Sequence, residues 1–126
     1  MATIELTTDN FVSEVEGNDI LLVDFWASWC GPCRQFAPVY EAASEKHADI
    51  AFGSVNTEEQ QQLSMEFQVT SIPTLMVFRD QILVFAQPGA LPPASLEQLI
   101  TAVRDLDMDD VRRKIAEDSD EQQKQA

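Results

Sequence analysis

The chain has 126 residues, which suits a single domain with one hydrophobic core and excludes a large multidomain machine. Apolar residues make up 44% of it, enough to build that core. The 22 acidic residues outnumber the 8 basic ones and give a formal net charge of -14. This balance argues against nucleic acid or an anionic membrane as the main partner.

The chain shows no sign of membrane insertion or export. No apolar run approaches the roughly 20 residues that a membrane-spanning helix needs. Residues 1–10 lack the basic start and the apolar centre of a secretory signal. We therefore expect a cytoplasmic protein, although a mature exported form has the same features.

Four apolar runs have the length and composition of strands. The first is unbroken except for Asp24, and it is typical of a central strand that is buried on both faces. The other three are rich in β-branched and aromatic residues, and the last two are close enough to form an antiparallel hairpin. The expected strands are Ile20–Ala27, Ile50–Val55, Thr74–Phe78 and Ile82–Phe85.

Helical patterns separate these strands. One apolar stripe has the spacing i, i+3, i+4 and i+7, and it consists of Phe36, Val39, Tyr40 and Ala43. Two capping-box spacings, at Thr57 and at Ser95, predict helices that begin near Glu58 and near Leu96. A further helix is expected around Phe11. The order α, β, α, β, α, β, β, α predicts an α/β fold, with a central mixed sheet and helices on both faces.

The composition changes near Leu106, which predicts a domain over residues 1–106 and an acidic extension over residues 107–126. Val111 and Ile115 are four residues apart, so either the last helix continues or a short extra helix forms. Residues 118–126 contain no large apolar residue, and we expect them to be disordered. A solvated tail is favoured over a docking segment for a partner.

The two cysteines, Cys30 and Cys33, follow a buried strand and precede an amphipathic helix. In that context a C-x-x-C sequence indicates redox chemistry. With one distant histidine, His47, a closed four-ligand zinc site within one chain is not expected. A structural disulfide over so short a loop stabilises by only about 2 kcal/mol. The pair is therefore predicted to be catalytic rather than structural.

The helix start distinguishes the two sulfurs. Side chains at i and i+3 of a helix meet, so the pair can form a disulfide. Cys30 is expected at the exposed helix N-terminus, where free N–H groups and the helix dipole favour a thiolate nucleophile. Cys33, one turn further on, is expected to be shielded and to act as the resolving thiol. Pro32 falls in the first turn, where its missing N–H is tolerated.

Asp24 is a carboxyl group inside a strand that is predicted to be buried. An unpaired carboxylate in such a place costs several kcal/mol unless the group is protonated or paired. Burial is therefore expected to raise its pKa. A neutral acid with local hydrogen bonds is the alternative to a functional role.

Three segments together resemble the thioredoxin family, in its order and spacing: Val23–Cys33 (VDFWASWCGPC), Ile72-Pro73-Thr74 and Pro88–Leu91 (PGAL). The resemblance covers about residues 4–105. It implies the thioredoxin fold and a dithiol–disulfide oxidoreductase that reduces protein disulfides and serves cell redox homeostasis.

The resemblance also implies roles for site residues. Asp24 would help to deprotonate Cys33. A cis peptide at Pro73 would lie beside the cysteines, so that the Ile72 backbone can pair with an extended client peptide. Trp29, Pro73, Gly89 and Ala90 would form a shallow apolar rim for such clients, and Gly31 and Pro32 would tune the reduction potential.

The partners implied are disulfide-containing client proteins and a flavoprotein thioredoxin reductase that uses NADPH. The chain itself has no nucleotide-binding pattern, and we expect no cofactor. A bound metal is not expected either, and the chain is expected to be a monomer. Two residues depart from the family pattern. Ser54 stands where many thioredoxins carry a lysine facing the buried acid, and Gln81 stands where a hairpin glycine is common, which predicts a different turn.

Three other functions stay open. An oxidase or isomerase can use the same fold, although Gly31-Pro32 resembles the reducing members. A binding module would hold a partner through the rim or the acidic extension, with incidental thiols. Zinc shared between two chains is the third.

Overall fold

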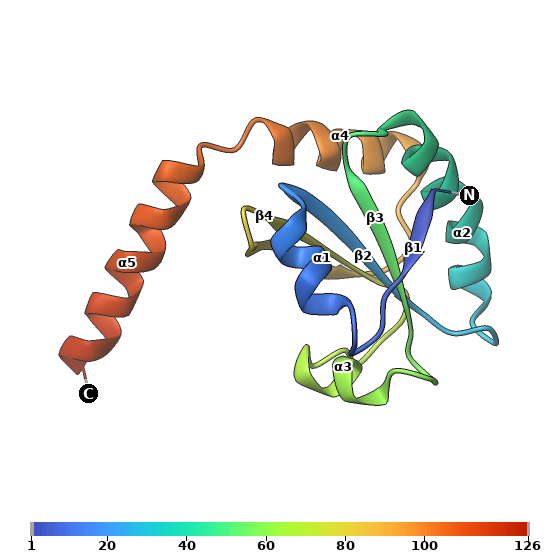
Figure 1. Ribbon diagram of the computed structural model, residues 1–126, viewed down its shortest axis with the longest axis horizontal. Coiled ribbons are helices and arrows are strands. Elements are labelled where there is room, and N and C mark those ends of the chain that lie inside the picture. The colour runs from blue at the N-terminus through green and yellow to red at the C-terminus, as the bar shows by residue number, and fades with distance from the viewer. Residues whose placement is uncertain (1, 126) are drawn as a thin grey trace.

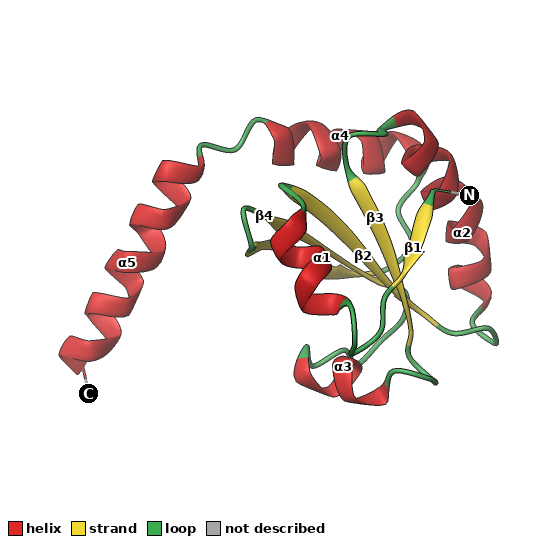
Figure 2. Cartoon of the chain, in the orientation of Figure 1, coloured by secondary structure: helices red, strands yellow, loops and turns green. Residues whose placement is uncertain are grey.

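A computed structural model describes the backbone of residues 2–125 and the side chains of residues 2–120 (Figure 1). Strands and helices alternate along most of the chain, as Figure 2 shows. In order, the elements are β1 (Thr3–Glu5), α1 (Phe11–Gly17), β2 (Ile20–Trp26), α2 (Gly31–Lys46), β3 (Ala51–Asn56), α3 (Gln61–Glu66), β4 (Thr74–Arg79), β5 (Ile82–Pro88), α4 (Pro93–Arg104) and α5 (Met108–Gln125).

The strands form one mixed sheet in the order β1-β3-β2-β4-β5. β1, β3 and β2 are parallel, whereas β4 is antiparallel to β2 and β5 is antiparallel to β4. β2 is the central strand and is paired on both edges. Its sequence is almost wholly apolar because both of its faces are covered by core clusters. The predicted mixed sheet and the hairpin between the last two strands are confirmed.

Helices cover both faces of the sheet, because side chains along a strand alternate between faces. On β2, Leu21, Val23 and Phe25 pack in one cluster with residues of α1 and α3. Leu22 packs in the other cluster with residues of α2 and α4. Asp24 has the same parity as Leu22, and it therefore belongs to the face that α2 covers.

Two helices begin at other residues than the capping-box spacings predicted, and one strand was not predicted. The Thr57 hydroxyl donates to the Trp26 carbonyl oxygen at 3.0 Å instead of capping a helix, and α3 begins only at Gln61. α4 begins two residues before Ser95, at Pro93, because proline is well suited to a first helical turn. β1 has three residues, too few for a recognisable alternation.

The hairpin between β4 and β5 turns through Asp80 and Gln81, which both have positive φ, 51° and 69°. Two left-handed residues in succession are typical of the type I′ turn that tight hairpins favour. The turn adopts this geometry with Gln81, rather than glycine, at its second position.

α5 continues to Gln125, whereas the sequence predicted disorder over residues 118–126; Ala126 lies outside the described residues. Asp107 starts the helix, because its carboxylate accepts the Asp110 N–H at 3.2 Å. Ion pairs at i, i+3 and i, i+4 spacing, such as Asp110 with Lys114, add to the first turns. The division at residues 106 and 107 stays a prediction. Within residues 2–125, no helix combines the length and the apolar character that a membrane crossing requires.

Candidate active site

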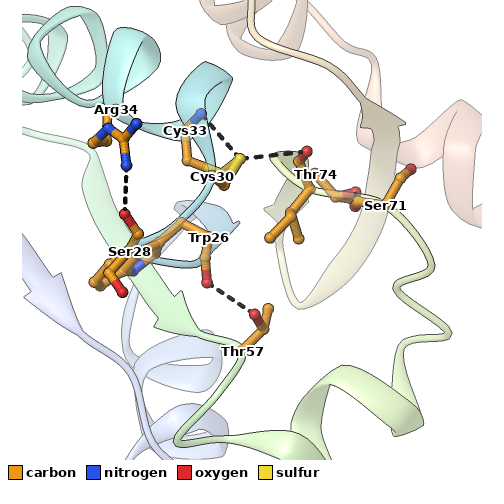
Figure 3. Close-up of a disulfide and its surroundings, with 9 residues drawn as sticks. Trp26, Ser28, Cys30, Cys33, Arg34, Thr57, Ser71 and Thr74 are labelled. Carbon is orange, nitrogen blue, oxygen red and sulfur yellow. Dashed lines mark hydrogen bonds between the residues drawn. A yellow bond between two sulfur atoms is a disulfide. The ribbon is translucent and has the colours of Figure 1, made fainter.

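The two cysteines form a disulfide at the start of α2 (Figure 3). Their Cα atoms are 5.2 Å apart, within the range that a disulfide needs. Cys30 is the N-cap residue of α2, and the backbone N–H of Cys33 donates to the Cys30 Sγ at 3.2 Å. A negative charge on this sulfur would therefore receive a hydrogen bond and the favourable end of the helix dipole.

The two cysteines do not differ in burial while they are joined. Cys30 is 4% exposed and Cys33 is 3% exposed. The expected exposure of Cys30 is therefore absent from the disulfide form, because both cysteines form a cluster with Ala27 against which Trp26 and Ile72 pack. The two sulfurs differ instead in hydrogen bonding, since the Cys30 Sγ accepts the Cys33 N–H.

Ile72, Pro73 and Gly89 are joined by short backbone contacts near Cys30. The Ile72–Pro73 peptide is cis, and the Ile72 carbonyl oxygen lies 3.7 Å from the Cys30 Sγ. The Gly89 N–H donates to the Pro73 carbonyl oxygen at 2.8 Å, which joins the end of β5 to the start of β4. Gly89 has a φ of 106°, a conformation that favours glycine. Ala90 follows on the surface.

Trp29 is exposed directly beside the cysteines, with 67% of its surface accessible. A large apolar side chain in that position is available to contact another molecule. Gly31 and Pro32 occupy the first turn of α2, where Pro32 is exposed and Gly31 is half-buried. Trp29 thus adjoins Cys30 in the chain, and Ile72 approaches Cys30 from a separate loop.

Polar residues that the sequence reasoning missed hold the loops around the pair (Figure 3). The Arg34 guanidinium donates to the Ser28 carbonyl oxygen at 2.9 Å and ties α2 to the loop before it. The Thr74 hydroxyl donates to the Ser71 carbonyl oxygen at 2.5 Å in the turn before β4. No sequence pattern signals these bonds, since they depend on how separate loops meet.

Asp24 is buried on β2, 5% exposed, and its Oδ1 has no hydrogen-bond partner among the described residues. Burial raises the pKa of this carboxyl from 3.8 to about 7, because removal from water penalises the charged form. The predicted direction of the shift is confirmed. A carboxyl group with such a pKa can exchange a proton near neutral pH.

A cavity of about 220 Å³ connects this acid to the surface. Buried Asp24, Cys33 and Tyr40 line its inner part, and exposed Ser28 and Arg34 line its outer part. The cavity has polar walls as well, since it also touches Thr3, Glu41 and Ser54. Asp24 and Cys33 therefore line one common cavity.

His47 lies away from this site. Its Nε2 is 2.9 Å from a Glu97 carboxylate oxygen, and its Nδ1 is 3.1 Å from an Arg104 nitrogen. These contacts join the end of α2 to α4, which gives His47 a structural position. Among the side chains of residues 2–120, no group of three or more His, Cys, Asp or Glu is arranged to hold a metal ion.

A disulfide at a helix N-terminus, beside a cis proline and above a buried acid, defines a thiol–disulfide oxidoreductase. A family model described as Thioredoxin matches residues 2–102. The chain is 55% identical over 116 residues to a putative thioredoxin 2 of Streptomyces coelicolor, covering 92% of this chain and 87% of the relative. It is 41% identical over 103 residues to a thioredoxin of Alicyclobacillus acidocaldarius, covering 81% and 98%.

Solved structures agree with these sequence matches. A Plasmodium falciparum thioredoxin superposes with a TM-score of 0.73 at 33% identity, covering 79% of this chain and 97% of that one. A structure on thiol resolution in yeast mitochondrial 1-Cys peroxiredoxin via glutathione/thioredoxin systems gives 0.74 at 29% identity, covering 80% and 95%. The chain belongs to the thioredoxin family. It is a protein-disulfide reductase that works by dithiol–disulfide exchange, and its clients are proteins with disulfides.

Proposed function

We propose that Cys30 is the attacking thiol and Cys33 the resolving thiol. The Cys30 thiolate attacks one sulfur of a client disulfide, forms a mixed disulfide and releases the other client sulfur as a thiolate. Cys33, as a thiolate, then attacks the Cys30 Sγ and releases the second client sulfur. Two electrons pass to the client, and the Cys30–Cys33 disulfide is the product.

The hydrogen bond from the Cys33 N–H to the Cys30 Sγ carries this assignment. Such a donor stabilises a negative charge on the Cys30 sulfur. Cys33 lies one turn inside the helix and lines the cavity of Asp24 instead. The two sulfurs thus have different partners, which matches two different chemical steps.

Asp24 is proposed to take the proton of Cys33 when the mixed disulfide is resolved. Its pKa of about 7 leaves a sizeable carboxylate fraction at neutral pH, so it can act as a base there. The shared cavity lets the proton leave towards Ser28 and Arg34, the outer part of the cavity wall. A client bound over Cys30 does not have to move for the proton to leave by this route.

Client peptides are proposed to lie in extended form over Ile72, Pro73 and Gly89. The Ile72 carbonyl oxygen already faces the reactive sulfur at 3.7 Å, so a peptide aligned with that backbone would bring its disulfide to Cys30. The exposed Trp29 ring and Ala90 would supply apolar contacts. Gly31 and Pro32 are proposed to influence the reduction potential from the first turn of α2.

We further propose a reducing compartment, the cytoplasm, and recycling by a flavoprotein thioredoxin reductase that draws on NADPH. Persistent reduction of client disulfides needs such an electron source, because each turnover leaves the protein oxidised. The net charge of -14 supports proteins, rather than nucleic acids or anionic membranes, as partners.

The equilibrium reduction potential of the Cys30–Cys33 couple tests this function, read by Trp26 and Trp29 fluorescence in a defined thiol buffer. We expect a value near about -270 mV, which is typical of thioredoxins. A value above about -180 mV would indicate an oxidant or isomerase and overturn the proposed compartment as well. In the same series, retained disulfide-reductase activity of Cys30→Ser would overturn the assigned nucleophile.

A further inference from the structure

Tyr40 is a buried tyrosine on α2 that lines the cavity of Asp24. Its side chain is 2% exposed, and its ring contacts the rings of Phe36 and Phe52, with centroids 5.5 and 5.3 Å away. These aromatic contacts fix the ring from two sides, because interiors are closely packed. The polar end of the side chain is therefore held in one place.

The hydroxyl proton of Tyr40 is committed to the backbone. The hydroxyl donates to the Gly53 carbonyl oxygen at 2.7 Å, and a carbonyl oxygen can only accept, so the direction of this bond is fixed. Gly53 directly precedes Ser54, the register partner of Asp24 on β3. While this bond is kept, the phenol oxygen can accept a hydrogen bond from the cavity but cannot donate one.

Tyr40 and Asp24 also interact electrostatically. Burial, and next the charge of Asp24, raise the pKa of the Tyr40 hydroxyl well above its ordinary value, and the bond to Gly53 opposes them only in part. Tyr40 therefore keeps its proton at neutral pH. A fixed acceptor near a carboxyl group favours the protonated form of that group, because only this form has a proton to donate.

The other charged or titratable side chains of the cavity wall have partners already. All three come from α2, namely Cys33, Arg34 and Glu41, whereas β1 and β3 add only hydroxyl groups. Cys33 is in the disulfide, and Arg34 donates to a backbone carbonyl oxygen at 2.9 Å. The Glu41 carboxylate accepts two hydrogen bonds from the start of the chain, both at 2.9 Å. The Ser54 hydroxyl can rotate to donate as well as to accept, so Tyr40 is the fixed acceptor.

We propose that Tyr40 is a positioning residue for the proton step, and that its oxygen accepts, directly or through a water molecule, the hydrogen bond of protonated Asp24. The inference rests on the proposed role of Asp24 as the base for Cys33. The thiol proton of Cys33 passes to the Asp24 carboxylate, and the new O–H turns towards the Tyr40 oxygen. The Cys33 thiolate then attacks the Cys30 Sγ. Tyr40 itself neither gains nor loses a proton.

Tyr40→Phe removes the acceptor and keeps the packed ring. Carboxyl carbon NMR of the disulfide form is expected to show the Asp24 pKa about 0.5 to 1 unit below its value of about 7 in the unchanged chain, because the protonated acid has lost a hydrogen bond. An unchanged pKa would overturn the proposal and leave Tyr40 as a packing residue. A raised pKa would overturn it too, since the hydroxyl would then be a donor to the carboxylate.

Ser44→Ala is the matched control. Ser44 is also a hydroxyl residue of α2 that is 2% exposed, and it donates to the Glu41 carbonyl oxygen at 2.6 Å, but it does not line the cavity. Its loss is expected to leave the Asp24 pKa unchanged. An equal fall in both variants would assign the effect to a looser α2 and overturn the role of Tyr40.

A second measurement needs no substitution, because Tyr40 is the only tyrosine in the chain. With a ¹³C label on the tyrosine ζ carbon, its single resonance is expected to follow the titration of Asp24, with a midpoint near pH 7. The same resonance should not titrate in Asp24→Asn. A resonance that stays constant in the unchanged chain, or that titrates equally in Asp24→Asn, would overturn the proposal.

The rate of the second exchange separates this inference from the proposed function. Reduced chain mixed with an aromatic disulfide releases one coloured thiolate through Cys30 and a second through Cys33, and stopped-flow absorbance follows both. In Tyr40→Phe, the acid limb of the second rate is expected to move to lower pH. An unchanged pH profile in Asp24→Asn would contradict the proposed base, and this inference with it. A changed profile in Asp24→Asn, with none in Tyr40→Phe, would overturn the role of Tyr40 alone.

Discussion

Asp24 and Ser54 are register partners on the parallel strands β2 and β3, and both line the same cavity behind Cys33. Ser54 makes no hydrogen bond to the acid within the described side chains, and the Asp24 Oδ1 has no partner. Because no cation stands at this position, burial acts on Asp24 unopposed and its pKa rises to about 7. This neighbour relationship places the titration of the buried acid in the neutral pH range.

Ser54→Lys is expected to lower the pKa of Asp24 by about one to three units, because an ammonium group at this distance favours the carboxylate. Carboxyl carbon NMR of the disulfide form measures the pKa directly. Ser54→Met is the control, since it adds similar length without charge and is not expected to lower the pKa. An equal effect of both changes would show that filling the cavity, rather than charge, controls the acid.

The stability of the disulfide form is expected to fall as pH rises from about 4 to about 7. The Asp24 pKa is about 7 in the folded chain against an ordinary value of 3.8, so the folded state binds the additional proton in this window. The shift corresponds to about 4 kcal/mol of stability that is present below pH 4 and lost above pH 7.

Urea unfolding between pH 4 and pH 8 measures this dependence, and Asp24→Asn is its control. The amide does not titrate, so the variant should lose most of the slope and be more stable than the unchanged chain at pH 8. A slope that persists in the variant would assign the effect to other acids.

Cys33→Ser is expected to accumulate a mixed disulfide between Cys30 and a client protein, because the second exchange has lost its thiol. Non-reducing electrophoresis and mass spectrometry with a disulfide-containing test protein measure the adduct. The double variant Cys30→Ser/Cys33→Ser is the control and should form none. An adduct formed through Cys33 in the Cys30→Ser variant, at a comparable rate, would contradict the assigned roles.

Gly53→Ala is expected to destabilise the fold by about 1 to 3 kcal/mol. A Cβ at this position would overlap the Leu6 side chain, whose Cγ lies 2.8 Å away, and Leu6 is fully buried. Chemical unfolding measures the loss. Gly17→Ala is the matched control, since a Cβ there meets no atom within 4 Å, and its stability should stay unchanged or rise.

Gln81→Gly is expected to stabilise the hairpin by about 0.5 to 1 kcal/mol, because Gln81 has a φ of 69° that glycine adopts without a steric penalty. The gain should appear as a higher midpoint in thermal unfolding. Gln62→Gly, on α3, is the contrasting change and should lower the midpoint, since glycine weakens a helix. A lower midpoint for Gln81→Gly would show that the Gln81 side chain contributes contacts that outweigh its backbone strain.

The sequence by itself determined the sheet, most of its helices and the position of the cysteine pair. These depend on local patterns: the apolar run of β2, the C-x-x-C spacing and the apolar stripe of α2. Asp24 was found in the same way, since it interrupts an otherwise apolar strand. β1 was not predicted, because its three residues, Thr3–Glu5, are too few to show the alternation of a strand.

The tertiary structure alone decided how separate segments meet. It placed Thr3, Tyr40 and Ser54 from three elements around the cavity of Asp24, and it left the Asp24 Oδ1 without a hydrogen-bond partner among residues 2–120. It also buried Cys30 as deeply as Cys33 in the disulfide form. Such contacts form only when distant residues are packed together, so the free energies that they contribute have no signature in the local sequence.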